Sequence, residues 1–372
     1  MMVASEAELA ACVADAVDPL SIRGGDTRGM AGAGAALSVA GLSGITLYEP
    51  GALTMVAQAG TPVAEVEAAL AKENQRLAFE PMNHCGVMGR QGDPTIGGVF
   101  AANVSGPRRI NVGAARDFLL GVRYVDGRGV VVKNGGRVMK NVTGYDLVKL
   151  MAGSFGTLGV LSEVSFKVLP RVETQASLVL HGLDDAQAVT AMSRAMGSPF
   201  EVTGAAHDPA TRQTVLRVEG FEASVAYRIE QLKTLLRAQA DDMTVLASSD
   251  SDAFWIKQRD LTAFHGGEGD VWRVTCKPSL APALIGKAGA QAHVLDWAGG
   301  LLWLRMAQGA DLRTRLGPFD GHATIVRADA QTKAQLGVFH PETAGVAKLT
   351  AGLRARFDPK GLFSPGLMGA VV

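Results

Sequence analysis

Apolar runs bounded by turn residues alternate with amphipathic stretches over the first 170 positions. Strict alternation predicts strands, and a repeat of about 3.6 residues predicts helices. We expect helices over 7–16 and 61–73, and strands over 20–23, 53–59, 118–125, 130–132 and 160–168. Ser5 and Glu8 form a capping box that opens the first helix. Asp126 and Gly127 join two of the strands as a hairpin turn.

The alternation of apolar runs and amphipathic stretches becomes less regular after Pro170 and Arg171, where we place a domain boundary. We expect strands near 177–180, 214–218, 271–275 and 323–327, a helix over 223–238 and a last helix over 342–356. Strands and helices that do not alternate regularly are typical of an α+β fold. The predicted parts are therefore 1–170, an α+β domain over 171–340, and a C-terminal segment over 341–372.

Of the 45 glycines, 25 fall within the first 170 positions, where they cluster in loops. The first cluster runs from Arg23 through Gly24, Gly25, Asp26 and Thr27, directly after a predicted strand. Backbone amides with little side-chain bulk suit an anionic pyrophosphate. The loop is a candidate phosphate cradle, and an ordinary turn is the alternative.

A longer block of small and hydroxyl residues covers 94–106, and a third covers 144–147 and 153–160. A planar ring could lie against the second block, with Thr95, Asn103 and Ser105 at its polar edge. The alternative is a tight loop that opens a packed helix. Three such blocks in one half of the chain favour a single large ligand that contacts all of them.

Composition narrows the function classes. Lys plus Arg and Asp plus Glu number 36 each, so no net field attracts nucleic acid or an anionic membrane. We expect no nucleic-acid partner, no signal peptide and no inserted span, and we expect a cytoplasmic location. The three cysteines and seven histidines are scattered, which disfavours a metal or iron–sulfur site built by this chain alone. Arg108 and Arg109 are interpreted as part of a solvated loop, with partner docking as the alternative.

The order of the three blocks, followed by a strand that ends at Pro170, resembles the FAD-binding domain of the vanillyl-alcohol oxidase class, also called the PCMH-type flavin domain. The match covers positions 15–170, and the tail over 357–366 resembles the segment with which that class closes the flavin site. Within the class, the compact length and the run over 137–146 most resemble the FAD-binding subunits of bacterial glycolate oxidases. The resemblance implies a two-subdomain FAD-binding domain, a smaller α+β cap domain and a tail that packs back.

The resemblance also implies which residues hold FAD. We expect one set of residues to contact the pyrophosphate, the flavin with its ribityl chain, and the adenosine of FAD. The set is Arg23, Gly24, Gly25, Asp26, Thr27, Arg28, Pro81, Thr95, Ile96, Gly97, Gly98, Ala101, Ala102, Asn103, Ser105, Gly106, Lys140, Gly144, Tyr145, Asp146, Gly156, Thr157, Leu158, Gly159 and Val160.

Three departures from the class matter. Relatives that bond flavin covalently place a histidine in the first loop, whereas this chain has Asp26 and Thr27, so we expect non-covalent FAD. Val112 stands where many relatives have a tyrosine ahead of Arg116. The larger glycolate oxidase and lactate dehydrogenase subunits carry a paired-histidine metal site in the cap, and nothing here matches it.

A flavin enzyme that oxidises a 2-hydroxy acid needs cations for the carboxylate and a base for the hydroxyl proton. Arg273 and His322 in the cap are the candidates, although a surface cation or a satisfied polar residue is the alternative for each. The resemblance implies glycolate oxidation to glyoxylate in a complex with a larger FAD-binding subunit and an iron–sulfur subunit, peripheral at the inner membrane through these partners. Two other functions stay open, a non-catalytic FAD relay or assembly subunit and a stand-alone alditol or lactone oxidase.

Overall fold

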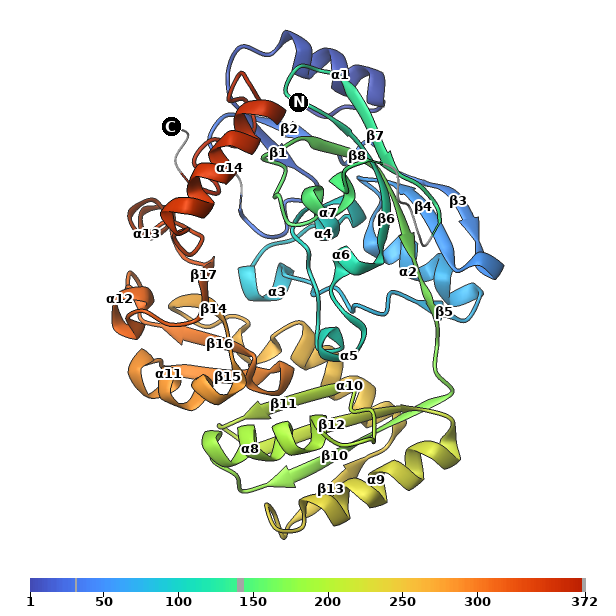
Figure 1. Cartoon of the computed structure of the whole chain (residues 1–372), viewed down its shortest axis with the longest axis vertical. Coiled ribbons are helices and arrows are strands. Elements are labelled where there is room, and N and C mark those ends of the chain that lie inside the picture. Colours follow the sequence, from blue (N-terminus) through green and yellow to red (C-terminus); the bar gives the residue numbers. More distant parts are fainter. Residues whose placement is uncertain (31, 139–143, 370–372) are drawn as a thin grey trace.

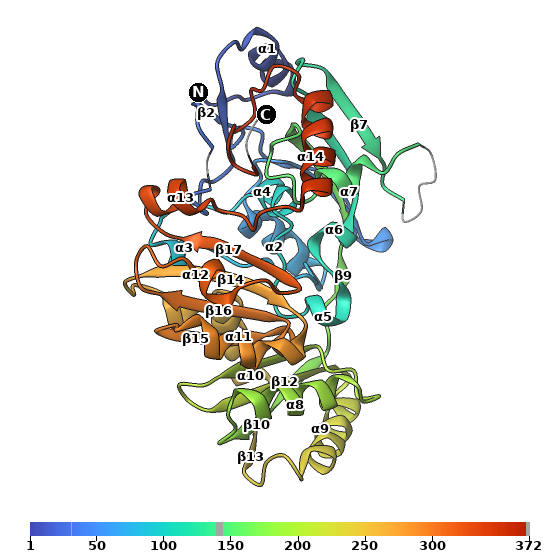
Figure 2. The same ribbon diagram turned by 60° about the vertical axis from the view of Figure 1, so that its left-hand side comes forward.

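The computed structural model describes residues 1–30, 32–138 and 144–369, which form two parts stacked one above the other (Figure 1). The upper part contains the first 170 residues and the lower part contains the strands between 174 and 327. Helix α14 (Ala344–Phe357) and the residues after it return to the upper part (Figures 1 and 2). Residues 358–369 therefore lie beside the first strands although they are far from them in the sequence.

A small first layer opens the upper part. Helix α1 (Glu6–Asp15) packs above the parallel strands β1 (Leu20–Arg23) and β2 (Ala35–Ser38). The Ser5 hydroxyl accepts the hydrogen bond of the Glu8 amide, and the Glu8 carboxylate accepts that of the Ala4 amide. The predicted cap is thus confirmed on its serine side, with the carboxylate reaching one residue further back than in the usual box.

The second layer of the upper part is a five-stranded antiparallel sheet in the order β3-β4-β8-β6-β7. Its strands are β3 (Ile45–Glu49), β4 (Thr54–Gln58), β8 (Val160–Lys167), β6 (Leu119–Val125) and β7 (Val131–Gly135). The helices and short strands around it are α2 (Val63–Lys72), β5 (Gln75–Arg76), α3 (Cys85–Met88), α4 (Ile96–Ala101), α5 (Arg109–Val112), α6 (Ala115–Phe118), α7 (Leu147–Met151) and β9 (Leu169–Pro170). The pairing of β6 with β7 confirms the predicted hairpin.

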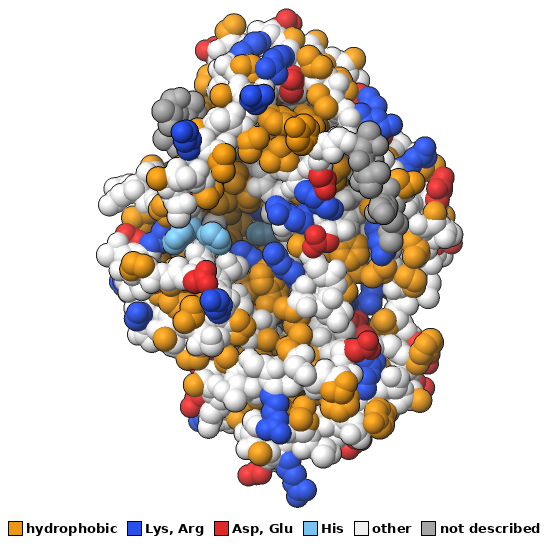
Figure 3. All heavy atoms as spheres, in the orientation of Figure 1, with side chains coloured by type: hydrophobic (Ala, Val, Ile, Leu, Met, Phe, Trp, Pro, Cys, Tyr) orange, Lys and Arg blue, Asp and Glu red, His pale blue; other side chains and the backbone are white. Residues whose placement is uncertain are grey.

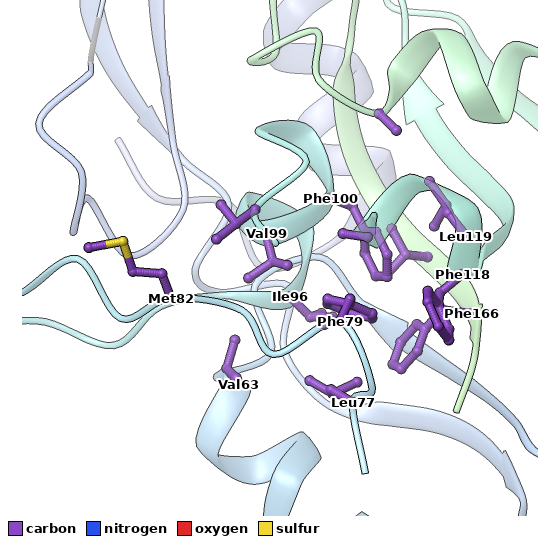
Figure 4. Packing of buried hydrophobic residues seen from close by; sticks show 14 of the residues in the cluster. Val63, Leu77, Phe79, Met82, Ile96, Val99, Phe100, Phe118, Leu119 and Phe166 are labelled. Atoms are coloured by element: carbon purple, nitrogen blue, oxygen red, sulfur yellow. The ribbon is translucent and has the colours of Figure 1, made fainter. Parts of the chain in front are cut away.

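Helix α4 is anchored from behind by phenylalanines (Figure 4). The ring of Phe79 lies 5.6 Å from that of Phe100 and 5.3 Å from that of Phe118, and Phe100 lies 5.4 Å from Phe166 on β8. Ring pairs at such distances add about 0.5–1.5 kcal/mol each to the burial of their area. The opposite side of this short helix is thereby free to face a cavity.

The lower part is built on an eight-stranded antiparallel sheet in the order β13-β10-β12-β11-β15-β16-β14-β17. The strands are β10 (Thr174–His181), β11 (Gly204–Asp208), β12 (Gln213–Gly220), β13 (Met243–Leu246), β14 (Asp270–Cys276), β15 (Ala292–Asp296), β16 (Leu301–Met306) and β17 (Gly321–Arg327). The helices are α8 (Asp185–Met196), α9 (Glu222–Leu236), α10 (Ser248–Arg259), α11 (Ala281–Ala288), α12 (Leu312–Leu316) and α13 (Ala330–Leu336). The α+β class predicted from the sequence is confirmed.

Buried charges join the two parts. Arg217 on β12 is 1% exposed and donates from its two terminal nitrogens to the two oxygens of Glu80, over 2.9 and 3.0 Å. Beside this pair, Arg108 donates from Nε to Glu219 over 2.8 Å. Burial alone raises the pKa of Glu219, but Arg217 and Arg108 outweigh it and lower that pKa. Arg108 is therefore a buried structural cation, and its interpretation as part of a solvated loop is wrong.

The tail is held by backbone hydrogen bonds to β1. The Leu20 amide donates to the carbonyl of Leu362 over 2.7 Å, and the Ser364 amide donates to the carbonyl of Leu20 over 2.8 Å. The carboxylate of Asp358 accepts from the amides of Leu362 and Phe363. The segment after α14 thus continues the small β1-β2 layer on its open side.

Candidate functional site

A cavity opens between the first loop of the chain and helix α4. We call it the glycine-loop cavity; it comprises about 910 Å³ of empty space, including its open mouth. Its walls include these residues of the predicted FAD site: Arg23, Gly24, Gly25, Asp26, Thr27, Arg28, Thr95, Gly97, Gly98, Ala101, Ala102, Gly156, Gly159 and Val160. The structure therefore brings together parts of all three glycine-rich blocks around one space.

The glycines of the first loop allow two loops to touch. A Cβ added at Gly25 would lie 1.7 Å from the carbonyl oxygen of Asp93, and one at Gly24 would lie 2.4 Å from Oγ1 of Thr95. Real Cβ atoms essentially never lie this close to another heavy atom, so a side chain at either position would force the two loops apart. Thr95 in turn caps α4, because its Oγ1 accepts the hydrogen bond of the Gly98 amide over 3.3 Å. The loop and the helix start are locked to each other.

The charges around this cavity favour an anion. Arg28 donates to the carbonyl of Gly98 over 2.5 Å, and burial lowers the pKa of this guanidinium to about 10. Among the described residues that line the cavity, one is acidic, Asp26. Its Oδ2 lies 3.2 Å from Nη1 of Arg23 and 3.2 Å from Nη1 of Arg90. The negative charge of Asp26 is thus offset on both sides.

A second cavity adjoins the first and lies between the two parts of the molecule. We call it the arginine cavity, because Arg28, Arg109, Arg116 and Arg273 line it, with about 1250 Å³ of empty space including open solvent. No Asp or Glu stands among its lining residues in the described part of the chain. Figure 3 shows a hollow in the middle of the molecule, with histidines on one rim and Lys or Arg on the other.

Two of these arginines lie on one tryptophan. The guanidinium carbons of Arg109 and Arg273 are 4.7 and 5.0 Å from the ring centroid of Trp297, which is a cation–π geometry. Burial, and next the charge of Arg109, lower the pKa of Arg273 to about 10. Such mutual repulsion is relieved when an anion binds between the cations.

Two histidines contribute to the arginine cavity in different ways. His322 on β17 is exposed at the rim, and its ring centroid lies 5.7 Å from that of His340. His84 is buried and lines both cavities, with Nδ1 3.2 Å from the carbonyl oxygen of Met82. Burial, and next the charge of Arg28, lower the pKa of His84 to about 3. The two cavities are thus continuous at Arg28 and His84.

Other residues of the predicted FAD site lie elsewhere. Asn103 and Ser105 line the arginine cavity. Ile96 at the start of α4 and Leu158 in the loop before β8 are buried in the hydrophobic core. The carbonyl of Gly106 accepts from Trp297 Nε1 over 3.0 Å, and Thr157 Oγ1 donates to the carbonyl of Ser154 over 2.7 Å. Pro81 is buried beside Met82 without lining either cavity.

The run from Gly144 to Asp146 is not brought to the glycine-loop cavity. These residues line a separate hollow with Asn134 and Lys149. Tyr145 is 88% exposed, and the Asp146 side chain accepts from the Lys149 amide as the cap of α7. Lys140 lies outside the described residues. The physical reason is local, because this segment opens helix α7, which packs against β6 and β7.

Sequence reasoning missed several residues of the arginine cavity. His84, Arg109, Met82, Phe155 and Trp303 converge there from segments that no spacing rule connects. Arg109 carries the clearest signal, because it comes shortly after a glycine block and begins the short helix α5. Its interpretation as part of a solvated loop is wrong, since it is half-buried in that helix and lies over Trp297.

Comparison with known proteins agrees with this geometry. Residues 1–135 match the model of the FAD binding domain family. The chain is 34% identical over 357 residues to glycolate oxidase subunit GlcE of Escherichia coli. The aligned region covers 95% of this chain and 93% of that protein. It is also 40% identical over 85 residues to glycolate oxidase subunit GlcD of Bacillus subtilis, and this aligned region covers 23% of this chain and 18% of that protein.

Solved structures share the fold at low identity. An alkyldihydroxyacetonephosphate synthase superposes with a TM-score of 0.71 at 16% identity, over 98% of this chain and 76% of its own. A p-cresol methylhydroxylase superposes with a TM-score of 0.70 at 12% identity, over 100% of this chain and 88% of its own. The fold and the matches define an FAD-dependent oxidoreductase with a PCMH-type FAD-binding domain. The chain belongs to the glycolate oxidase subunit GlcE family.

The residues present fit FAD. The glycine-loop cavity offers backbone from the first loop and from α4, and its acidic residue is neutralised by two arginines. Gly98 faces Arg28, so that a Cβ there would come within 3.2 Å of Nη2. A pyrophosphate needs this combination of close backbone and nearby cations.

No helix in the described residues is both long and apolar enough to span a bilayer.

Proposed function

We propose that this chain holds FAD non-covalently in the glycine-loop cavity and oxidises a short 2-hydroxy acid in the arginine cavity, as the flavin subunit of a glycolate oxidase complex. The observation that carries the proposal is a set of four arginines in a cavity continuous with the FAD site, with no Asp or Glu among the described residues that line it. Such cations are stable together when they bind an anion.

The carboxylate of the acid would lie between Arg273 and Arg109. Each guanidinium presents parallel N–H groups that match the two oxygens of a carboxylate. Both are oriented by Trp297, at 4.7 and 5.0 Å from its ring, so little freedom is lost when the anion binds. Bound FAD supplies a hydride acceptor for the carbon that carries the hydroxyl. The chain's own residues hold that carbon near the junction of the two cavities.

Electrons leave the FAD through partners in this proposal. We infer that the partners are a larger FAD-binding subunit and an iron–sulfur subunit, which connect the chain peripherally to the inner membrane. The three cysteines of this chain, Cys12, Cys85 and Cys276, stand apart from one another as free thiols. They therefore offer no shared thiolate set for an iron–sulfur cluster.

Helix α14 is the surface that we assign to the larger subunit. Val346, Leu349 and Leu353 form an apolar stripe on it that is 48%, 70% and 36% exposed. Lys348 and Arg356 stand on the same helix, and it carries no acidic residue. An apolar stripe flanked by cations suits a partner surface with an apolar centre and acidic rim.

The test is the absorbance of the purified chain before and after anaerobic addition of glycolate. A flavin spectrum that acid releases and glycolate bleaches supports the proposal. The variant Arg273→Gln should keep its FAD and bleach at least 10-fold more slowly. Arg237→Gln, which changes an exposed arginine directly after α9, should behave as the wild type. An FAD spectrum that glycolate leaves unchanged would favour a relay or assembly subunit, and peroxide formation by the isolated chain would favour a stand-alone oxidase.

A further inference from the structure

His84 stands at the junction of the glycine-loop cavity and the arginine cavity. It directly precedes α3, and its backbone carbonyl accepts the hydrogen bond of the Met88 amide in the first turn of that helix. The side chain is 9% exposed, so its ring has contact with the cavities and little with bulk water. The imidazole is thus placed by a helix start and presented to the space where the two cavities meet.

The tautomer of His84 follows from its neighbour. Nδ1 lies 3.2 Å from the carbonyl oxygen of Met82, and a carbonyl oxygen only accepts hydrogen bonds. Nδ1 therefore carries the hydrogen of the neutral ring, and Nε2 carries the lone pair. Within the described residues, no side chain or backbone group makes a hydrogen bond to Nε2.

The charged groups that face His84 are Arg28 and Arg273, one on each side of the junction. Burial, and next the charges of Arg28 and Arg273, lower the pKa of His84 to about 3, so the ring is neutral at physiological pH. No carboxylate of the described chain lines the arginine cavity to compensate them. A neutral imidazole with a free lone pair next to two cations can accept a proton once an anion reduces their repulsion.

We propose that Nε2 of His84 is the base that accepts the hydroxyl proton of the 2-hydroxy acid. The inference rests on the proposed function, because it takes the acid to lie in the arginine cavity. The hydroxyl O–H bond breaks and its proton goes to Nε2. The C–H bond at the same carbon breaks and its electron pair leaves with the hydrogen to FAD, which is reduced. A carbonyl forms, and the product is the 2-oxo acid.

The negative charge of the bound substrate changes the pKa of the base. A carboxylate bound near Arg273 offsets part of the positive field at His84, so the pKa of the ring rises on binding. Proton transfer is most effective when the pKa of the base approaches the working pH. His84 thus becomes a useful base with the acid bound and stays neutral without it. His322, a candidate base from the sequence, is exposed at the rim, and its ring centroid lies 5.7 Å from that of His340.

The experiment compares His84→Gln with the wild type in the FAD-loaded protein. Stopped-flow reduction by glycolate is followed anaerobically, and released FAD is measured in parallel. We expect the limiting rate to fall by about 100-fold or more, as is typical for loss of a general base. FAD content should stay within twofold, because glutamine keeps a donor for the Met82 carbonyl. The matched control His181→Gln, on β10 and outside the lining of both cavities, should change the rate by less than about threefold.

Two outcomes separate the base from the proposed function. Reduction at the wild-type rate in His84→Gln, with wild-type protein bleached by glycolate, overturns the role of His84 and leaves the function intact. Wild-type protein that binds FAD and is not bleached overturns the function and the base with it.

A second measurement uses the wild-type protein, and it tests the proposal even if His84→Gln does not fold. In wild-type protein with ¹⁵N-labelled histidine, NMR should show His84 with its proton on Nδ1 and a pKa that rises when oxalate is added as a non-oxidisable anion. A proton on Nε2, or a pKa unmoved by bound oxalate, overturns the proposal.

Discussion

The guanidinium of Arg28 donates a hydrogen bond to the carbonyl of Gly98 over 2.5 Å and so ties the first glycine loop to helix α4. Both elements line the glycine-loop cavity, and Arg28 also lines the arginine cavity. The Arg28 side chain thus stabilises the glycine-loop cavity and also places its positive charge in the arginine cavity.

Replacing Arg28 by alanine should weaken FAD binding by about 10- to 100-fold, because a hydrogen bond from a charged donor contributes about 1.5–3 kcal/mol. Titration of the FAD-free protein with FAD, followed by flavin fluorescence, measures the change. Arg128→Ala, at an arginine that is more than half exposed, is the control and should bind as the wild type. Equal affinity in both variants would show that Arg28 does not organise the site.

Replacing Gly25 by alanine should separate the first loop from the segment around Asp93. The new Cβ would fall 1.7 Å from a backbone oxygen, so the loop must move. We expect loss of FAD binding and a lower melting temperature. Gly286→Ala is the matched control, because a Cβ there meets nothing within 4 Å and lies in helix α11. The control should be as stable as the wild type or more stable by up to about 1 kcal/mol.

Replacing Arg217 by methionine removes the side chain that donates to both oxygens of the half-buried Glu80 carboxylate, which keeps Arg108 at 3.2 Å. Breaking one side of a buried pair costs about 3–5 kcal/mol. Urea unfolding followed by circular dichroism should therefore show a large decrease in midpoint. The double variant with Glu80→Gln should lose clearly less than the sum of the single losses. Strict additivity would mean that the two side chains do not stabilise each other.

Asp296 should make stability depend on pH. Burial raises the pKa of this carboxyl from 3.8 to about 7 in the folded state. The folded protein then holds a proton that the unfolded chain releases, so this contribution is present below about pH 4 and is lost as the pH rises to about 7. The full effect is on the order of 4 kcal/mol. Asp296→Asn keeps the acceptor for the Trp297 amide, and at pH 8 it should be more stable than the wild type.

The comparison is best made as the difference in melting temperature between Asp296→Asn and wild type at pH 5 and at pH 8. Other groups titrate in both proteins and cancel in the difference. A difference that is the same at both pH values would contradict a raised pKa.

Replacing Leu349 by glutamate should weaken assembly with the larger flavin subunit and leave FAD content unchanged. Leu349 is 70% exposed on α14 and supports no core cluster of the described chain. Co-expression of both subunits and size-exclusion chromatography measure the complex. The control Tyr227→Glu alters an exposed aromatic on α9 and should leave the complex intact. A complex of wild-type stability in Leu349→Glu would exclude the stripe as the contact.

The sequence predicted elements well where the signal is local. The strand over 20–23 is observed with the same bounds, and the helix expected over 7–16 is observed over Glu6–Asp15. Apolar periodicity, a cap and a turn decide these segments within a few residues of chain. The glycine blocks also indicated a shared ligand, because clusters of small residues are rare without close backbone approach.

The sequence did not predict what depends on the meeting of distant segments. Arg109 and Arg273 share the ring of Trp297, although 164 positions separate the two arginines. The run over 144–146 looked like a ligand loop and serves as a helix cap, since glycine and aspartate suit both roles. The division into 1–170, 171–340 and 341–372 stays a prediction.

The tail that pairs with β1 bears on how the cofactor is acquired during synthesis. Leu20 exchanges hydrogen bonds with Leu362 and Ser364, and Ser364 Oγ also accepts from the Ile22 amide at the edge of the glycine-loop cavity. Synthesis runs from the amino end, so these residues leave the ribosome after all the strands of both parts. The nascent chain can fold its central sheet earlier, but this edge forms only once residues 362–364 have been made. Stable capture of FAD is therefore expected to wait for these residues, and a chain truncated before Leu362 is expected to fold in part and to lack its flavin.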